Sequence, residues 1–545
     1  MTLFEQILTA RGLVTRAARQ AFLQPDYMAV KHDPFLLPDM KKAVARLKQA
    51  RQHGEKIVIY GDYDIDGLSA TALLLDAFGK FGFEDVDAFI PNRFVEGYGM
   101  TMGAVDKVRD MGADLIVTVD TGSLCHAEIA YAASLGIDTV VTDHHNVAET
   151  LPPSVAAVNP KFPGHTYPFR DLCGAGVAFK LVQALQTELD GLPGGYEKWL
   201  LDLVALGTVC DIVTLADENR ANVYWGLEVL KKQQRPGLKA LMAVAGIEPE
   251  QVNARHLGFG LGPRMNAAGR LETAQHALDM LTARDGLAAL EASEKLEELN
   301  TKRRSIQDAI FEEACQQAEE LANDRVLVVS SGGWNHGVIG IVASKLVEKY
   351  KKPVFIIGER GEEATGSARS FGDFSAADAV RAADDIIIKG GGHGAAAGVT
   401  LATEKIGDFR RRVNEFYDSL QLTNQERYLL PRADVEIDDF SEINEELVEN
   451  LAKMEPFGNG NPEPVLKIAR ASVLSMRRMG ADGQHVKLAL RDKNGKVLQM
   501  LAFNAPEEFF REPGDEVAAW FQPTINEWQG VRTVEGRLLH VILLD

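Results

Sequence analysis

Short β-branched runs alternate with helical stretches along the first part of this chain. The runs that read as buried strands are Lys56–Tyr60, Val86–Ile90, Leu115–Val119 and Thr139–Thr142. The helices expected around them are Leu68–Phe81, Thr101–Met111, His126–Leu135 and Gly176–Leu185. This alternation is typical of a parallel sheet with helices on both faces. The predicted fold class is α/β, with a doubly wound parallel sheet.

The remainder of the chain predicts further bodies. Apolar residues at helical spacing from about Gly286 to Leu321 indicate one helix on the order of 50 Å long, enough to bridge two domains. A second α/β unit begins at Arg325, and short strands with turn signals after Arg432 predict a small antiparallel barrel. The expected division is an N-terminal helical segment packing on the core (1–50), a first α/β domain (51–275), connecting helices (276–324), a second α/β domain (325–425) and the barrel (432–545).

Bulk composition excludes several classes of protein. With 46% hydrophobic and 25% charged residues among 545, the chain has the composition of an ordinary globular protein. A net charge of −20 argues against a protein that coats nucleic acid indiscriminately, although a local basic groove is compatible with it. The four cysteines are scattered and suit a reducing compartment. We expect a cytoplasmic protein, because there is no evident secretory signal and no run of ~18 apolar residues to span a membrane.

The segment Gly61–Gly67, which reads GDYDIDG, directly follows the first predicted strand. Its carboxylates, Asp62, Asp64 and Asp66, would repel one another at neutral pH unless a cation neutralised them. In open α/β sheets, binding sites form outside the carboxyl ends of the strands, where this segment lies. A metal site is one interpretation, and a solvated turn with helix-capping aspartates is the other.

Later apolar segments end in the same kinds of side chain. The residues that directly follow them are Asp120, Asp143, His144, His145 and Asp211. Because separate strands end at one edge of a parallel sheet, we expect these groups to converge on the first three acids. Carboxylates with imidazole suit Mn²⁺, Mg²⁺ or Zn²⁺, and the excess of oxygen ligands favours the harder ions. Two ions that share Asp120 would suit phosphoryl hydrolysis.

These segments together resemble the successive motifs of the DHH phosphoesterase superfamily. Four downstream segments narrow the resemblance to the RecJ family of bacterial single-strand-specific exonucleases, namely Leu261–Leu271, Trp334–Leu346, Gly366–Ser370 and Gly391–Gly398. The likeness runs over almost the whole chain, with the motifs in order. It implies a DHH catalytic domain, a DHHA1 substrate-binding domain and an OB-like barrel that binds nucleic acid.

The resemblance implies 5′-to-3′ degradation of single-stranded DNA in repair and recombination, with two Mn²⁺ or Mg²⁺ ions. By position, one ion would be held by Asp64 and Asp120, and the other by Asp66, Asp120, His144 and Asp211. His145 would face the scissile phosphate, and Asp62 and Asp120 complete the catalytic set. Many relatives have histidine where this chain has Tyr60, so the first ion is expected to have one ligand fewer and to bind more weakly.

A substrate-binding set follows from the same resemblance: Arg93, Tyr98, Arg264, Asn266, Arg270, Ser367, Arg369, Ser370, Gly392 and His393. Arginine can fork onto a phosphate, tyrosine can stack on a base, and the glycine-rich loop Gly390–Gly394 can bind an anion through its N–H groups. Ion pairs, packed rings and tight turns would explain the same residues without a substrate. In the barrel, Trp520, Phe521 and Trp528 either stack on bases or pack in the core.

Two other functions fit parts of the sequence. Smaller DHH relatives hydrolyse short oligoribonucleotides or cyclic dinucleotides, but they generally lack the barrel. A non-catalytic replication scaffold would have lost metal ligands that this chain retains. The expected partner is single-stranded DNA, with single-strand-binding protein and a helicase as candidates, and we expect a monomer without membrane contact.

Overall fold

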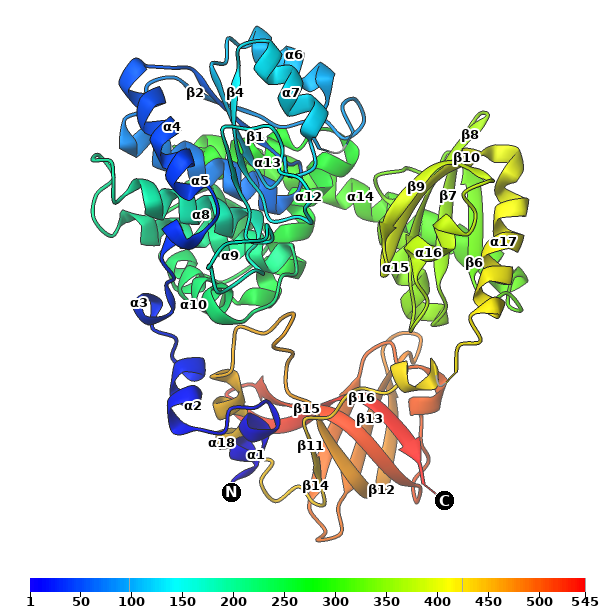
Figure 1. Cartoon of the computed structure of the whole chain (residues 1–545). Coiled ribbons are helices and arrows are strands. Elements are labelled where there is room, and N and C mark those ends of the chain that lie inside the picture. The colour runs from blue at the N-terminus through cyan, green and yellow to red at the C-terminus, as the bar shows by residue number, and fades with distance from the viewer. Residues whose placement is uncertain (98, 424, 545) are drawn as a thin grey trace.

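The computed structural model describes residues 1–97, 99–423 and 425–544. Three bodies lie at the corners of a triangle, and the long helix α14 (Gly286–Glu320) connects the first body to the second (Figure 1). Both termini lie at the third body, a β-barrel. Within the described ranges, no helix has the length and apolar character that a bilayer crossing requires.

The first body is built on a five-stranded parallel sheet, which confirms the predicted α/β class. Its strands are β1 (Ile57–Gly61), β2 (Val86–Phe89), β3 (Leu115–Val119), β4 (Asp138–Thr142) and β5 (Ala156–Val158), and sequence analysis did not predict the last of them. The strand order is β2-β1-β3-β4-β5, so the direction of winding reverses between β1 and β3. In such sheets the ligand lies outside the carboxyl ends of the two strands at the reversal.

Helices cover both faces of this sheet. One face is covered by α4 (Met40–His53), α5 (Ile65–Phe81) and α8 (Gly174–Leu185), and the other by α6 (Met102–Asp110) and α7 (His126–Ser134). A helical cap completes the body, made of α9 (Leu201–Cys210), α10 (Asp217–Lys231), α11 (Pro236–Val244), a π-helical turn η4 (His256–Leu261), α12 (Gly262–Leu271) and α13 (Gln275–Thr282). The strands are buried on both sides, which explains their continuous apolar sequences.

Helix α14 contributes to two hydrophobic cores. Leu296 and Leu299 are buried in the core of the first body, whereas Ile310 and Ala314 are buried in that of the second. The second body is a mixed five-stranded sheet in the order β6-β7-β8-β10-β9 with three helices. Its elements are β6 (Leu327–Gly332), α15 (Ile339–Tyr350), β7 (Val354–Arg360), β8 (Glu363–Arg369), α16 (Ala376–Arg381), β9 (Ile387–His393), β10 (Ala396–Ala402) and α17 (Ile406–Ser419).

The third body is a six-stranded sheet in the order β11-β12-β13-β14-β16-β15, closed into a barrel because β12 also pairs with β15. Its elements are β11 (Val435–Ile437), α18 (Glu445–Ala452), β12 (Leu466–Met479), β13 (His485–Arg491), β14 (Val497–Ala502), β15 (Glu516–Trp528) and β16 (Val531–Leu543). The barrel is not wholly antiparallel as predicted, since β11–β12 and β14–β16 pair in parallel. Trp520 and Phe521 are buried, which favours the packing interpretation, whereas Trp528 is exposed.

The N-terminal segment does not pack on one core. Leu3, Ile7 and Leu8 of α1 (Leu3–Ala10) are buried in the barrel core, where α1 packs against α18 and β11. Helix α2 (Arg16–Leu23) lies beside the barrel (Figure 1). The chain then passes through α3 (Tyr27–Val30) to α4, which covers the first sheet. The expected single unit therefore divides between the first and third bodies.

A loop of the third body, residues 454–461, is docked on the first body, and we call it the docking loop. The Arg220 guanidinium of α10 donates hydrogen bonds to the backbone carbonyls of Met454, Glu455 and Pro456. The side-chain amide of Asn459 donates to the carbonyl of Ile212 at 2.8 Å, just beyond α9. The docking loop thus holds the turn that follows α9.

Candidate active site

The three acids of GDYDIDG lie at the reversal point of the first sheet, where β1 ends and α5 begins. The carboxylate of Asp64 accepts hydrogen bonds from the N–H groups of Asp66 (2.9 Å) and Gly67 (3.2 Å), so it caps α5. The capping interpretation is therefore correct for Asp64, and it does not exclude a metal site. Helix α5 begins at Ile65, three residues earlier than predicted, because of this cap.

Asp66 is fully buried in the first turn of α5 and faces the N-terminus of α8. The N–H groups of Gly174 and Ala175 donate hydrogen bonds to its carboxylate. A helix N-terminus favours negative charge, so α8 offsets part of the repulsion that Asp66 experiences. A Cβ on Gly207 would collide with this carboxylate, which explains the glycine in α9.

Asp120 directly follows β3 and is 1% exposed. Its backbone is left-handed, with φ of 61°, a conformation that costs energy outside glycine and that clusters at functional sites. One carboxylate oxygen lies 3.0 Å from Nε2 of His144. A Cβ on Gly174 would lie 2.5 Å from Cβ and 2.7 Å from Oδ1 of Asp120. The absence of a side chain at position 174 therefore leaves room for the Asp120 side chain.

This contact makes Gly174→Ala a test of the site. We expect Mn²⁺ to bind about 10–100-fold more weakly, the usual cost of disturbing a group that orients a metal ligand. Gly176→Ala on the same helix is the matched control, since its Cβ would meet Leu172 at 3.5 Å, an ordinary contact. Titration calorimetry of both variants measures the effect, and an unchanged affinity in Gly174→Ala would contradict the placement of Asp120.

Asp143 orients the two histidines. Its carboxylate accepts hydrogen bonds from the N–H groups of Ser123 (2.9 Å), His144 (2.7 Å) and His145 (3.1 Å), and it lies 2.9 Å from Nδ1 of His145. Burial alone would raise the pKa of Asp143, but these hydrogen bonds hold it well below its usual range. Burial lowers the pKa of His145, yet the bond to Asp143 outweighs it and raises that pKa to about 9. Asp143 thus holds the backbone of both histidines and the ring of His145.

Three groups of candidate metal ligands overlap at the site, and Asp120 belongs to two of them. Asp62, Asp64 and Asp120 form one group, and the ligand atoms of each group lie within 4.8 Å of one another. Two further groups share His144: one contains Asp66 and Asp211, and the other contains Asp120 and His145. Oδ1 of Asp120 and Nε2 of His144 are both buried and make no hydrogen bond within the described part of the chain. A cation between them would satisfy both atoms.

The acid–base properties of the cluster also fit a cation. Burial, followed by the charge of Asp64, raises the pKa of Asp62 to about 7 and that of Asp66 to about 6. Burial and the charges of Asp66 and Asp64 raise the pKa of Asp211 to about 8, and the pKa of Asp120 lies well above its usual range. A divalent cation would lower all four values, because positive charge stabilises ionised carboxylates.

Asp211 reaches the site from a helix rather than from a strand. The apolar segment before it forms α9, and Asp211 is the C-cap of that helix, which corrects the expectation that it follows a strand. Its carboxylate still lies 3.6 Å from Nε2 of His144. Tyr60 is fully buried, and its hydroxyl donates to the carbonyl of Gly99 at 3.0 Å, so its side chain is directed away from the acids.

Comparison with known proteins identifies the family. Family models match the DHH family N-terminal domain at residues 56–208, the DHHA1 domain at 323–419 and the RecJ OB domain at 433–540. The single-stranded-DNA-specific exonuclease RecJ of Dickeya dadantii (strain 3937) is 35% identical over 531 residues, covering 93% of this chain and 91% of that protein. This chain belongs to the RecJ family.

Other RecJ proteins agree. RecJ of Bacillus subtilis (strain 168), also named a single-stranded-DNA-specific exonuclease, is 39% identical over 96% of this chain, and the chain spans 66% of its length. The crystal structure of RecJ in complex with Mn²⁺ from Thermus thermophilus superposes with a TM-score of 0.83 at 30% identity, covering 99% of this chain and 76% of that one. The metal in that RecJ structure matches the chemistry of the donor set here.

Four arginines converge near the junction of the first two bodies of this RecJ chain. Burial, then the charges of Arg93, Arg303 and Arg369, lower the pKa of Arg270 to about 10. Their hydrogen-bond partners are neutral: Arg270 donates to the carbonyl of Gly337 (2.8 Å), Arg303 to Gln307 and Asn300, and Arg369 to Ser367 and the carbonyl of Ala368. Arg93 lies over the ring of Tyr63. Clustered guanidinium groups with neutral partners favour an anion.

Sequence analysis did not identify Arg303. It is one of two adjacent arginines in a long charged helix, and nothing in the pattern distinguishes it from Arg304. In the structure Arg303 is buried and Arg304 is exposed. Only the packing of α14 against both bodies sets the two residues apart.

The remaining predicted substrate residues lie in varied surroundings. Arg264 forms an ion pair with Glu297 and donates to the carbonyl of Gly260, which favours its structural alternative. The hydroxyl of Ser370 donates to the carbonyl of Phe374, whereas that of Ser367 accepts from Arg369. Asn266 lines a cavity beside α9. Tyr98 lies outside the described residues.

The glycine-rich segment is not the loop that sequence analysis predicted. Residues 390–393 belong to β9, an edge strand that pairs with β10, so their backbone groups on that side form a ladder rather than an anion nest. A Cβ on Gly390 would lie 2.5 Å from Val380, which makes glycine a packing requirement there. Gly392 and His393 are exposed at the end of this strand.

Proposed function

We propose that this RecJ protein is an exonuclease that releases nucleotides from single-stranded DNA, starting at a 5′ end, with two divalent cations, Mn²⁺ or Mg²⁺. The observation that carries this proposal is the overlap of three groups of candidate ligands, two of which share Asp120, beside a cluster of arginines with neutral partners. Carboxylates would hold the cations, and the guanidinium groups would hold the phosphates between them and the second body.

The ligand sets follow from these groups. Asp64 and Asp120, with Asp62 beside them, would hold one ion, and Asp66, Asp120, His144 and Asp211 would hold the other. When bound, the ions supply positive charge to the scissile phosphate and make water a stronger acid. Asp120 would belong to both sets. Because the Tyr60 hydroxyl donates to the carbonyl of Gly99, the first ion would have fewer protein ligands and would bind more weakly.

His145 faces the scissile phosphate in this proposal. The bond from its Nδ1 to Asp143 fixes the ring, and the raised pKa favours the protonated form, which donates a proton or a hydrogen bond to a phosphate oxygen. The contact between Asp143 and three backbone N–H groups keeps this pair in place. Asp143 is therefore a positioning residue.

The arginine cluster orients the strand. Arg369 and Ser367 of the second body bind the 5′ phosphate, and Arg93, Arg270 and Arg303 bind phosphates closer to the cations. Arg270 also bonds to Gly337 across the junction, so substrate binding and the packing of the two bodies share a side chain. His393 and Gly392 lie at the end of β9 and contact the same DNA strand in this proposal.

DNA blocked at one end tests the polarity. The purified protein is incubated with Mn²⁺ and single-stranded oligonucleotides that carry a bulky block at the 5′ end, at the 3′ end or at neither. We expect mononucleotides from the unblocked and 3′-blocked strands and at least tenfold less from the 5′-blocked strand. Release from the 5′-blocked strand alone would reverse the polarity, and no release from any strand would reject the nuclease assignment.

The same assay separates the substrates. Short oligoribonucleotides and cyclic dinucleotides are added as competitors. Preferential hydrolysis of either would indicate the alternative function, a DHH phosphodiesterase that acts on short substrates. The barrel favours long single strands, because its surface would be redundant for a dinucleotide. A cytoplasmic location and a single-strand-binding protein and helicase as partners belong to the same proposal, since all three follow from action on chromosomal single strands.

A further inference from the structure

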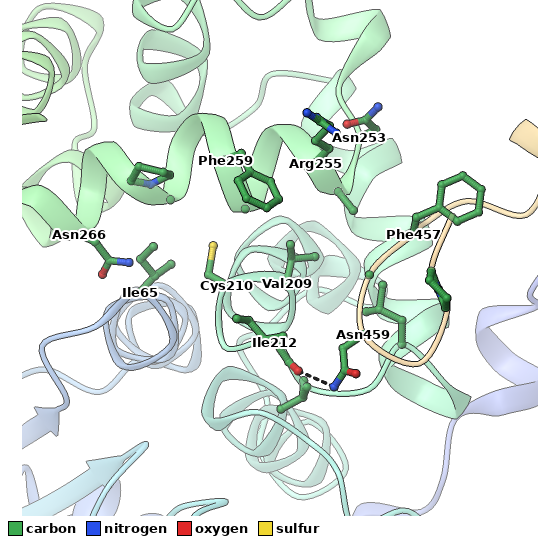
Figure 2. A pocket seen from close by; sticks show the side chains of 18 of the residues that line it. Ile65, Val209, Cys210, Ile212, Asn253, Arg255, Phe259, Asn266, Phe457 and Asn459 are labelled. Atoms are coloured by element: carbon green, nitrogen blue, oxygen red, sulfur yellow. Dashed lines mark hydrogen bonds between the residues drawn. The ribbon is translucent and has the colours of Figure 1, made fainter. Parts of the chain in front are cut away.

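A cavity of about 780 Å³ lies between the helices beside the acidic cluster and the docking loop. At one end it is lined by Ile65, which lies between Asp64 and Asp66, and by the neighbours of Asp211 in the chain. At the other end it reaches the docking loop, through Phe457 and Asn459 (Figure 2). Its volume lies within the range of roughly 300–1,000 Å³ typical of pockets for small ligands, so it has room for a nucleotide.

Phe259 projects into this cavity. Its side chain is 80% exposed, more than any other large apolar side chain in the described part of the chain. Figure 2 shows its ring between Asn266 and Arg255, directed toward Cys210 and Val209. It lies on the π-helical turn His256–Leu261, a rare backbone form that is frequent at functional sites. The Arg255 guanidinium lies over this ring at 5.8 Å from its centroid, and the ring remains exposed enough to stack on a base.

Ile212 forms another apolar wall of the cavity. It is 68% exposed, and its φ of 60° is a strained conformation for a β-branched residue. The hydrogen bond from Asn459 to its carbonyl, drawn in Figure 2, holds this strained turn. An exposed apolar side chain is therefore kept next to the candidate ligand Asp211 by two bodies of the protein.

The charges around the cavity indicate where phosphates would lie. Arg270 and Arg303 line its wall near the acidic cluster, and both have neutral hydrogen-bond partners. Toward the barrel, Arg537 is paired with Glu463 at 2.6 Å and Glu455 is close by, so that end carries no excess of positive charge. A strand would therefore place its phosphates along the arginines and its base in the apolar part.

We propose that this cavity binds an unpaired base of the DNA strand, on the 3′ side of the scissile phosphate, with Phe259 stacked on the base and Ile212 against its edge. The inference rests on the proposed nuclease function. It assigns a binding site to the part of the DNA that remains bound after the terminal nucleotide is released. A base in a duplex is stacked and paired, so it cannot also stack on Phe259. The cavity thus selects single strands at the catalytic centre itself.

The test is DNA binding in an Asp120→Asn background, so that no strand is cleaved. Fluorescence anisotropy measures the affinity for a single-stranded oligonucleotide and for a series in which one base at a time is removed, leaving the phosphates. We expect Phe259→Ala to weaken binding about 5- to 100-fold, the range measured for loss of one stacked base. Phe259→Trp retains the affinity, and Trp199→Ala, which removes an exposed ring from a separate cavity, leaves it unchanged.

The series of abasic strands supplies the decisive comparison. With Phe259 present, one abasic position weakens binding by a similar factor. In Phe259→Ala the same position has no further effect, because the stacking partner is already absent. Equal affinity of Phe259→Ala and its parent, or additive losses at every position, would overturn the proposal while leaving the nuclease assay above unaffected.

Discussion

Asp120→Asn is expected to abolish nucleotide release, by on the order of a thousandfold or more. In the proposed arrangement the residue belongs to both ligand sets, so its loss would disturb two ions at once, and metal charge stabilisation contributes several kcal/mol to phosphoryl transfer. The substitution also removes a negative charge from a buried, repelling cluster. In chelator at pH 8, the variant should therefore unfold at a higher temperature than the wild type.

The two measurements are end-labelled nuclease kinetics and calorimetric unfolding of the metal-free protein. Asp110→Asn is the matched control, because Asp110 is exposed and, among the residues that the structure describes, its ion pair is with its neighbour Arg109. That control should change neither quantity. Nuclease activity within tenfold of wild type, or a lower unfolding temperature for Asp120→Asn, would refute the shared-ligand arrangement.

Arg303→Leu is expected to weaken binding of single-stranded DNA about 10–100-fold. A hydrogen bond to a charged group contributes about 1.5–3 kcal/mol, and every 1.4 kcal/mol is a tenfold change in affinity. The slope of log affinity against log salt concentration should fall by about one, as expected when one phosphate contact is lost. Burial lowers the pKa of Arg303, so removing this charge should not destabilise the free protein.

Arg304→Leu provides the control for Arg303, because the neighbouring residue has the same charge but is exposed. Its effect on the salt slope should be small. Identical affinities and slopes for the two variants would mean that Arg303 serves only to connect Asn300 and Gln307 within α14.

The sequence was sufficient to predict that the acids and His144 lie close together at one edge of the sheet. The acids of GDYDIDG, Asp120 and His144 follow strands whose period and apolar character are unambiguous, and a parallel sheet brings such positions to one edge. The register pairs Gly61 with Val119 and Val119 with Thr142, so the residues after these strands are neighbours. Helix α14 was equally clear, because its apolar spacing persists over many turns.

Other features depend on tertiary contacts that leave no local pattern. Gly174 is required by the close approach of Asp120, which lies far away in the chain. The apolar segment before Asp211 is buried all round, and a short apolar run does not distinguish a strand from a helix. The glycines after residue 389 read as a loop, but pairing with β10 gives them a strand conformation. Phe259 became notable only through its exposure within a cavity.

The docking loop has a consequence for attempts to divide this enzyme. The Asn459 side chain of this loop donates to the carbonyl of Ile212, in the turn beside Asp211. Arg220 of α10 holds the docking loop through three of its backbone carbonyls. Deleting the barrel would therefore release a support of the candidate metal site as well as a proposed surface for DNA. A shortened protein without activity would have lost its catalytic geometry together with its grip on the strand, and Asn459→Ala in the intact chain is the variant that separates the two losses.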